Sequence, residues 1–334
     1  MSTPTVSIVV PTYNRQTLLP RALDSILAQT FDDWEIVLVD DGSTDATAEV
    51  AARYSNQLRD RLVLVQQPNR GSSAARNRGI ETSRGRYVAF LDSDDEFLPR
   101  KLERQLDLFR RSPDLGLVYG DYAFVDAAGV RHESAFAEHW LLAHQVPHER
   151  IAPGLCVCTG ELFDMLIRGY FISTIVGMVR RDALGDAIRF PEHCTYAEEW
   201  LFYLKVVKAW PAGFVDEPLC LHHHVPGSLA RSDKAANTRG YRDVLNAIRT
   251  SFDDLTPAQE RALHGQLAQT HRQLAYDARR GDQPRTALSH FALALRHRPS
   301  WRAAWECVSA VPRGLADRFS LAGSRRAAGR PIHE

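Results

Sequence analysis

Short apolar runs alternate with amphipathic segments over the first hundred residues. Runs rich in β-branched residues predict buried strands, and they cover residues 6–10, 35–39, 62–65 and 87–91. Between the first two runs, Leu19, Leu23 and Leu27 recur at the spacing of a helix that packs on a sheet. Strands that alternate with helices form parallel sheets with right-handed crossovers. We therefore predict an α/β fold whose mostly parallel sheet is flanked by helices.

The pattern in the later part of the chain predicts further strands and helices up to about residue 233 and helices alone beyond it. We expect a helix to about residue 111, strands at 117–119 and 175–179, a helix at 196–207, and a loop over about 133–154. Beyond that point the pattern predicts helices at 241–251, 257–280, 285–298 and 302–308. We therefore predict three parts: an α/β domain at 1–232, a helical extension at 233–312, and a basic flexible tail at 313–334. The sequence pattern of the helical extension resembles that of a tetratricopeptide unit.

Composition limits the classes of protein that need to be considered. The 41 Lys and Arg residues balance 41 Asp and Glu residues, so no overall charge favours a nucleic-acid partner. The five cysteines do not suggest a disulfide framework, and neither a signal peptide nor a membrane span is evident. We expect a cytoplasmic protein, with the basic tail able to contact anionic lipid at the inner face of a membrane. Its oligomeric state is left open.

An acidic cluster follows the strand predicted at 87–91. If the extended backbone continues past Leu91, Asp92 and Asp94 project to one side and can approach one divalent cation together. Ligands of doubly wound sheets bind at the carboxyl ends of the strands, where this cluster falls. An acidic surface turn is the alternative, and an isolated Asp-x-Asp favours that alternative. We expect a metal that carries a phosphate.

Polar residues at the other strand ends could reach a nucleotide. Tyr13 could stack on a base, Asp41 could accept a hydrogen bond from a base N–H, and Arg76 could pair with a phosphate. The same residues could instead be a packed aromatic, a turn residue beside Gly42 and a solvated helix residue. The chain has no Gly-x-Gly-x-x-Gly after its first strand and no P-loop motif, which disfavours dinucleotide and P-loop proteins.

Two further groups could take part in chemistry. Glu198 and Glu199 open the helix predicted at 196–207, where the helix dipole alone would favour acidic side chains. His222 and His224 share one face of an extended segment, so one of them could be a nitrogen ligand of the metal. Polar histidines at a strand end are an equally good interpretation from spacing alone.

Taken together, these motifs resemble those of glycosyltransferase family 2, whose fold is of the GT-A type. The resemblance covers roughly residues 5–230 and rests on six ordered segments: 9–14, 39–45, 71–79, 90–95, 197–199 and 224–228. It implies nucleotide contacts at Pro11, Tyr13, Asp41, Arg76 and Asp92, a metal at Asp92, Asp94 and His224, and catalysis at Glu199 with Glu198 as the alternative base. The family's usual Glu-Asp pair is Glu198-Glu199 here.

The resemblance also implies a reaction. We expect an inverting, metal-dependent transfer of a sugar from a nucleotide sugar, with UDP favoured and Mn²⁺ or Mg²⁺ as cofactor. The acceptor would be a carbohydrate or glycolipid hydroxyl, as in cell-surface polysaccharide biosynthesis. Two alternatives remain: a nucleotidyltransferase on the same type of sheet, and a helical-repeat scaffold that carries an inactive transferase domain.

Overall fold

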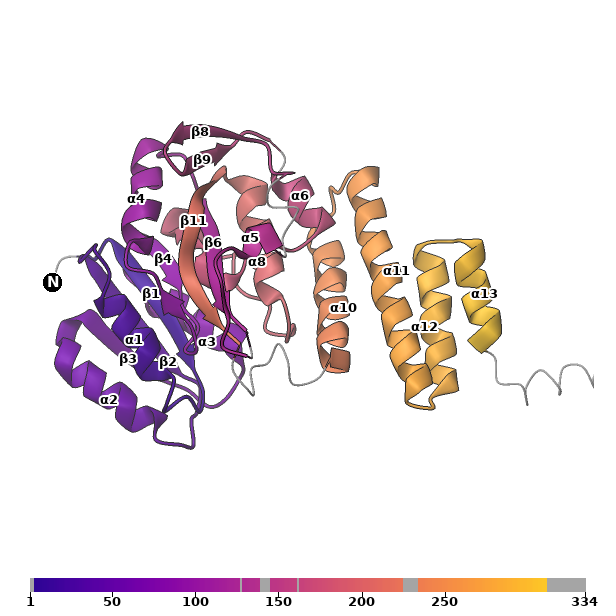
Figure 1. The fold of residues 1–334 in the computed structure, drawn as a ribbon, viewed down its shortest axis with the longest axis horizontal. Coiled ribbons are helices and arrows are strands. Elements are labelled where there is room, and N and C mark those ends of the chain that lie inside the picture. Colours follow the sequence, from indigo (N-terminus) through magenta and orange to yellow (C-terminus); the bar gives the residue numbers. More distant parts are fainter. Residues whose placement is uncertain (1–2, 127, 139–144, 161, 225–233, 311–334) are drawn as a thin grey trace, which may run out of the picture. The chain divides into compact units, whose positions relative to one another are not determined.

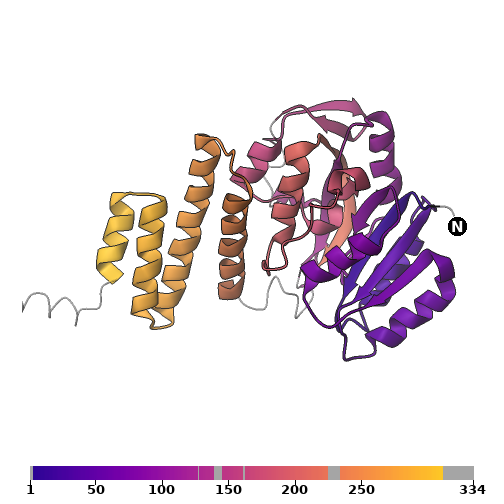
Figure 2. The same ribbon diagram turned by 180° about the vertical axis from the view of Figure 1, so that it is seen from behind.

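The computed structural model describes residues 3–126, 128–138, 145–160, 162–224 and 234–310. The chain divides into two compact units, Met1–Ser232 and Asp233–Glu334, which are described separately below. Figures 1 and 2 show the sheet of the first unit with helices on both of its faces. The α/β fold with a mostly parallel sheet flanked by helices, followed by helices at the carboxyl side, is therefore confirmed.

Four parallel strands form one half of the sheet, in the order β3-β2-β1-β4. Their bounds lie within two residues of those predicted: β1 (Val6–Thr12), β2 (Trp34–Asp40), β3 (Leu62–Gln66) and β4 (Tyr87–Phe90). β1 and β2 are buried along their whole length, which explains why their sequences are continuous apolar runs rather than alternating ones. In the pairing of these two strands, Thr12 lies opposite Asp40, so their carboxyl ends meet at the same edge.

The other half of the sheet is mixed. Beyond β4 the order continues β10-β6-β11-β9-β8, and β10 lies antiparallel to β4. The strand bounds are β6 (Leu117–Val125), β8 (His148–Ala152), β9 (Leu155–Cys158), β10 (Met178–Arg180) and β11 (Ala212–His223), with two-residue strands β5 (Glu96–Phe97) and β7 (Arg131–His132) pairing with β11 and β6.

Two predictions for this half are wrong in detail. The strand predicted at 175–179 begins only at Met178, because Thr174–Val176 form a 3₁₀ turn. The stretch predicted as a loop, 133–154, contains the short helix α5 (Ala135–Glu138) and the whole of β8. β8 is mostly exposed and polar, so it lacks the apolar pattern that identifies a strand.

Helices cover the sheet of the first unit and position the site residues. α3 packs against β1 and β2, and a Cβ on Gly79 would lie 2.2 Å from Val9 Cγ1, so only glycine permits this close approach. The bounds are α1 (Leu19–Leu27), α2 (Thr47–Leu58), α3 (Ser72–Thr82), α4 (Lys101–Arg111), α6 (Leu162–Arg168), α7 (Arg181–Leu184) and α8 (Glu198–Ala209).

The second unit consists of helices over its described residues, as predicted. Each helix packs on the next one along the chain, and the bounds are α10 (Lys234–Ser251), α11 (Pro257–Arg280), α12 (Pro284–His297) and α13 (Trp301–Ala310). Ala275, Ala287 and Phe291 form a core between α11 and α12. The tetratricopeptide interpretation stays a prediction, and the tail at 313–334 lies outside the described residues. No described helix combines the length and the apolar composition needed to span a bilayer.

Four histidines gather between α11 and α12. Nδ1 of His271 lies 3.1 Å from Nδ1 of His290, and the ring of His297 stacks on that of His271 with their centroids 5.6 Å apart. His264 contacts the edge of His297 at 5.0 Å. Burial first, then the nearby His290 and His297 and the Arg242 charge, lower the pKa of His271 to about 4. The folded unit therefore favours neutral imidazoles.

We predict that mild acid destabilises this unit. Because the folded pKa of His271 is lowered, its contribution to stability is present above the unfolded value of about 6.5 and is lost as the pH falls toward 4. Between pH 7 and 5 the free energy of unfolding should drop by roughly 2 kcal/mol. Hydrogen exchange of α11 and α12 peptides, corrected for intrinsic rates, measures this drop.

The control variants are His271→Gln, in which the drop should shrink, and His193→Gln, an exposed histidine of the first unit, in which it should persist. Equal protection of α11 and α12 at both pH values would contradict the prediction.

Candidate active site

Several of the predicted site residues lie at the carboxyl ends of adjacent parallel strands. Pro11 is paired in β1, and Tyr13 follows that strand with its side chain partly exposed. Asp41 follows β2, and Asp92 lies two residues after β4. Since β2, β1 and β4 are neighbours, the fold brings these sequence-distant residues to one edge of the sheet.

Asp41 organises the loop that leads into α3. Its Oδ1 accepts hydrogen bonds from Gln67 Nε2 at 2.8 Å and from the Arg70 backbone N–H at 2.9 Å, while Oδ2 accepts from the Gly71 backbone N–H at 2.8 Å. The residue is buried. An ionised carboxylate has about four acceptor positions, so three bonds leave room for one more donor, such as a base N–H.

Arg76 is the centre of a buried ion-pair network. Its NH2 nitrogen lies 2.7 Å from Asp92 Oδ1, and its NH1 nitrogen lies 2.7 Å from Glu198 Oε1. Glu198 also accepts a hydrogen bond from Ser72 Oγ at 2.9 Å. The side chain of Arg76 is only 6% exposed, so it is not the solvated helix residue that the sequence left open. Both terminal nitrogens are taken by carboxylates from separate parts of the chain.

Glu198 and Glu199 begin α8 but lie in different environments. Ala197, just before them, has a φ of 54° in the left-handed region, which is uncommon for a residue with a Cβ and turns the chain into the helix. Glu198 is buried and paired with Arg76. Glu199 keeps partial exposure, and its Oε1 accepts a hydrogen bond of 2.6 Å from the hydroxyl of Tyr170.

The electrostatics of Glu199 differ from those of a surface carboxylate. Removal of water by the surrounding protein, and then the negative charge of Glu198, raise the pKa of Glu199 to about 7. Arg76 and the hydrogen bond from Tyr170 act in the opposite direction. A carboxylate with such a pKa can both hold and release a proton near neutrality, as a general base must.

The acidic turn after β4 places Asp94 close to other charges. Burial, and then the charges of Asp95 and Asp92, raise the pKa of Asp94 to about 6, although Arg15 and His222 oppose the shift. Arg15 Nε lies 3.8 Å from Asp94 Oδ2. A bound cation would relieve this crowding of carboxylates, so Asp92 and Asp94 fit a divalent metal by their donor type and charge.

The route by which Asp92 and Asp94 come together differs from the prediction. The extended backbone does not continue past Leu91: β4 ends at Phe90, and the Asp95 N–H donates to the Asp92 carbonyl at 3.0 Å, which closes a turn. The turn forms because the buried Asp95 carboxylate binds β11, accepting from the His223 N–H at 2.9 Å and lying 2.9 Å from His222 Nδ1. Asp95 is therefore a structural anchor of the acidic cluster.

The histidine nearest these carboxylates is His222. Burial would lower its pKa, but the charge and hydrogen bond of Asp95 raise it to about 9, so the ring is positively charged at neutral pH. The backbone N–H of His224 donates to the Val125 carbonyl, and its ring lies 5.4 Å from that of Phe124. No three His, Cys, Asp or Glu side chains of the described residues are arranged to hold a metal. A metal contact of His224 remains a prediction.

Several residues of this site were not identified from the sequence. Tyr170 lies in irregular backbone between α6 and the 3₁₀ turn, and no pattern there points to Glu199. Ser72 lies inside a motif segment and Arg15 directly follows one, but neither residue was assigned a role from the sequence. The pairing of His222 with Asp95 was not predicted either, because the two residues lie 127 positions apart in the chain.

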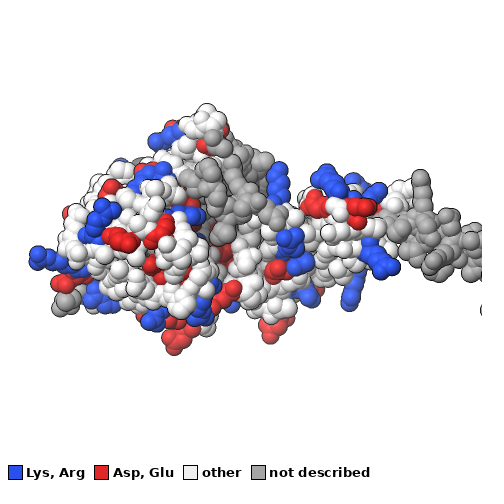
Figure 3. Space-filling view, turned by 90° about the horizontal axis from the view of Figure 1, so that it is seen from below, with Lys and Arg blue, Asp and Glu red and all other residues white. Residues whose placement is uncertain are grey.

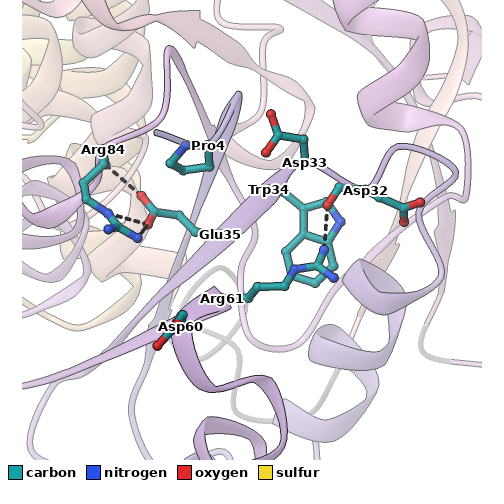
Figure 4. A pocket seen from close by; sticks show the side chains of 8 residues that line it. All are labelled: Pro4, Asp32, Asp33, Trp34, Glu35, Asp60, Arg61 and Arg84. Atoms are coloured by element: carbon teal, nitrogen blue, oxygen red, sulfur yellow. Dashed lines mark hydrogen bonds and ion pairs between the residues drawn. The ribbon is translucent and has the colours of Figure 1, made fainter. Parts of the chain in front are cut away.

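A separate hollow of about 380 Å³ lies near the amino ends of the strands. Figure 4 shows Arg84 bound to Glu35 and Arg61 lying over the ring of Trp34. It contains none of the candidate site residues. The acidic cluster at the carboxyl edge therefore stays the candidate active site.

Comparison with known proteins agrees with the resemblance to glycosyltransferases that the motifs indicated. Residues 7–160 match the family model for glycosyl transferase family 2. The putative teichuronic acid biosynthesis glycosyltransferase TuaG of Bacillus subtilis is 41% identical over 105 residues, which are 31% of this chain and 41% of TuaG. Three other curated relatives, all named glycosyltransferases, are matched over 30–51% of their own length.

Solved structures share the fold over most of the chain. S. aureus TarS 1-349 in complex with UDP-GlcNAc has a TM-score of 0.65 at 21% identity, covering 88% of this chain and 82% of that one. The mannosyltransferase PcManGT from Pyrobaculum calidifontis, in complex with GDP-Man and Mn²⁺, has a TM-score of 0.56 at 20% identity, covering 96% and 81%. Residues 7–160 thus match glycosyl transferase family 2, and the fold is similar to that of glycosyltransferases of the GT-A type.

Proposed function

We propose that the protein is an inverting glycosyltransferase that moves a sugar from a nucleoside-diphosphate sugar to an acceptor hydroxyl. The proposal rests on the different environments of the two glutamates. Glu198 forms an ion pair with Arg76, whereas Glu199 has no ion pair among the described residues and has a pKa of about 7. Glu199 is also the more exposed of the two, as a group that must meet an acceptor needs to be.

The reaction can be written from these residues. The acceptor oxygen attacks the anomeric carbon while Glu199 takes its proton, and the bond from that carbon to the diphosphate breaks, the electron pair leaving with the diphosphate. Tyr170 donates to Glu199 Oε1 and so orients the carboxylate toward the acceptor. One attack at carbon inverts its configuration, and a second carboxylate acting as nucleophile is not required.

Asp94 and Asp92 would hold the metal. A bound Mn²⁺ or Mg²⁺ supplies positive charge that neutralises the departing diphosphate. These ions are commonly held by one or two carboxylates together with phosphate oxygens of the substrate, which agrees with a site that lacks three preformed protein ligands among the described residues. Asp41, with its remaining acceptor position, would bind the base N–H, and Tyr13 would stack on the base.

The comparisons support the choice of donor and biological role. The structures that share this fold include complexes with UDP-GlcNAc and with GDP-Man and Mn²⁺, which favours a nucleotide-sugar donor and a divalent ion. We favour UDP and, from the name of the relative TuaG, a carbohydrate or glycolipid acceptor in cell-surface polysaccharide synthesis. The site is proposed to work on the cytoplasmic side.

Product analysis tests the proposal. Incubation with a panel of UDP- and GDP-sugars and Mn²⁺ should release a nucleoside diphosphate from at least one donor. Release of pyrophosphate, from a sugar phosphate and a nucleoside triphosphate, would identify a nucleotidyltransferase instead. Turnover of neither kind, with an acceptor panel present, would favour an inactive transferase domain.

We predict that Asp94→Ala weakens metal-dependent nucleotide binding. In titration calorimetry with UDP and Mn²⁺, the dissociation constant should rise by about tenfold or more, because a carboxylate ligand of the ion is lost. Asp186→Asn, which changes an exposed acid outside the motif segments, should bind as the parent does. Equal affinities with and without Mn²⁺ in the parent protein would contradict the metal assignment.

A further inference from the structure

The last described helix, α13, exposes an apolar face. Trp301, Trp305 and Val308 are 93%, 69% and 65% exposed, and their spacing of four and three residues puts them on one side of the helix. We call these three residues the tryptophan face. Each tryptophan could bury on the order of 200 Å² in a contact, so the face is far larger than one scattered surface hydrophobe.

The orientation of α13 is fixed by its opposite side. Ala303 is buried, and Glu306 accepts hydrogen bonds from Arg272 at 2.7 Å and from Tyr276 at 2.9 Å. Cys307 packs against the core between α11 and α12. The tryptophans therefore point away from the helices that hold α13. In helical arrays the outer face of the terminal helix is ordinarily polar. The tryptophan face is apolar instead, so we expect it to bind a partner that covers it.

Charge is divided unequally between the two units. Residues 233–334 carry 17 Lys and Arg against 10 Asp and Glu, a formal charge of +7, whereas residues 1–232 carry 24 against 31, a charge of −7. In the view of Figure 3, blue Lys and Arg side chains are prominent over the helices of the second unit. The zero charge of the whole chain thus conceals a basic helical unit.

The surroundings of the tryptophan face are basic as well. Arg302 lies between the two tryptophans with its side chain 75% exposed, and Arg296 and Arg298 precede the helix. The only acid on α13, Glu306, is paired and nearly buried. Residues 311–334, which follow, contain five Arg against two acids. A partner of the tryptophan face must therefore offer an apolar region for the indole rings and negative charge for the surrounding arginines.

We propose that the tryptophan face docks on a membrane surface that contains anionic lipid. Indole rings partition into the boundary between headgroups and acyl chains, and arginines beside them pair with lipid phosphates. Two other occupants of the face are disfavoured by like-charge repulsion. A symmetric contact with a second copy would bring two +7 units together, and the chain's own segment 311–334 is itself basic. The proposal does not depend on the transfer reaction.

Vesicle flotation of the full chain tests the proposal without any nucleotide sugar. We expect binding to phosphatidylcholine vesicles that contain phosphatidylglycerol, little binding to phosphatidylcholine alone, and a loss with rising salt. The double variant Trp301→Gln/Trp305→Gln should bind the anionic vesicles about tenfold more weakly. Val130→Gln, which changes an exposed residue of the first unit, is the matched control and should bind as the parent does.

Since the replaced side chains are exposed, circular dichroism and thermal unfolding should be the same for all variants. Failure of the parent to float with anionic vesicles overturns the proposal. Equal flotation of the double variant also overturns it and assigns the contact to the basic segments alone. A vesicle-free dimer that the double variant converts to a monomer, without flotation of the parent, would assign the face to a second copy.

Discussion

Glu199→Gln should reduce the turnover number by about 10²- to 10⁴-fold while leaving donor binding unchanged. The amide keeps the size of the side chain and can still contact the Tyr170 hydroxyl, but it cannot accept the proton of the acceptor. Because the proposed base acts on the acceptor rather than on the nucleotide, the dissociation constant of the nucleoside diphosphate should stay within twofold or so of the parent value. Stopped-time product assays and calorimetry measure the two quantities.

The matched control for this variant is Glu81→Gln, an exposed residue of α3 whose side chain is 52% accessible. It should leave turnover unchanged. Normal turnover of Glu199→Gln would remove Glu199 from the role of base, and a parallel loss of nucleotide affinity would show that the substitution has disturbed the donor site instead.

Arg76→Met should cost about 3–5 kcal/mol of folding free energy and abolish measurable transfer. Removing the guanidinium leaves the buried carboxylate of Glu198 and the partly exposed carboxylate of Asp92 without their partner, and breaking a buried ion pair costs about that amount. The loss of activity follows because both acids would move from the positions that the ion pairs fix. Arg76→Lys should restore little, since a single ammonium cannot span two carboxylates with separate nitrogens.

Urea unfolding measures the change in stability, and Arg78→Met supplies the comparison on the same helix. Arg78 is 55% exposed and forms a surface ion pair with Glu81, so its replacement should change the free energy of unfolding by less than about 0.5 kcal/mol. Equal destabilisation by the two variants would mean that the network around Arg76 is not the stabilising feature described here.

The parallel half of the fold could be predicted because its strands are buried on both faces. Continuous apolar runs such as that of β2, separated by amphipathic helices, leave few alternative arrangements. β8 could not be found in this way, because it is an exposed and polar strand at the end of the sheet order. The 3₁₀ turn before β10 has the same apolar composition as a strand, so composition alone could not distinguish the two.

For the candidate site, residue types were predictable but their partners were not. The motif segments identified Arg76, Asp92 and Glu198 one by one. They did not predict the ion pairs, because Arg76 is separated in the chain from Asp92 by 16 positions and from Glu198 by 122. Tyr170 lies 29 residues before Glu199 in irregular backbone, and its role depends on geometry that no local pattern encodes. The sequence therefore predicted which acids gather, and only the fold separates the paired Glu198 from Glu199.

That separation is tested most directly by the pH dependence of kcat/KM for the donor and acceptor pair that the product assay identifies. A base whose pKa is raised to about 7 must be ionised to act, so the rate should rise with pH through about 7 and then level off. In Glu198→Gln the negative charge that helps to raise this pKa is gone, and the residual activity should show its acidic limb at lower pH. A parent profile without a limb near neutrality, or a limb that Glu198→Gln leaves in place, would contradict the assignment of Glu199 as the base.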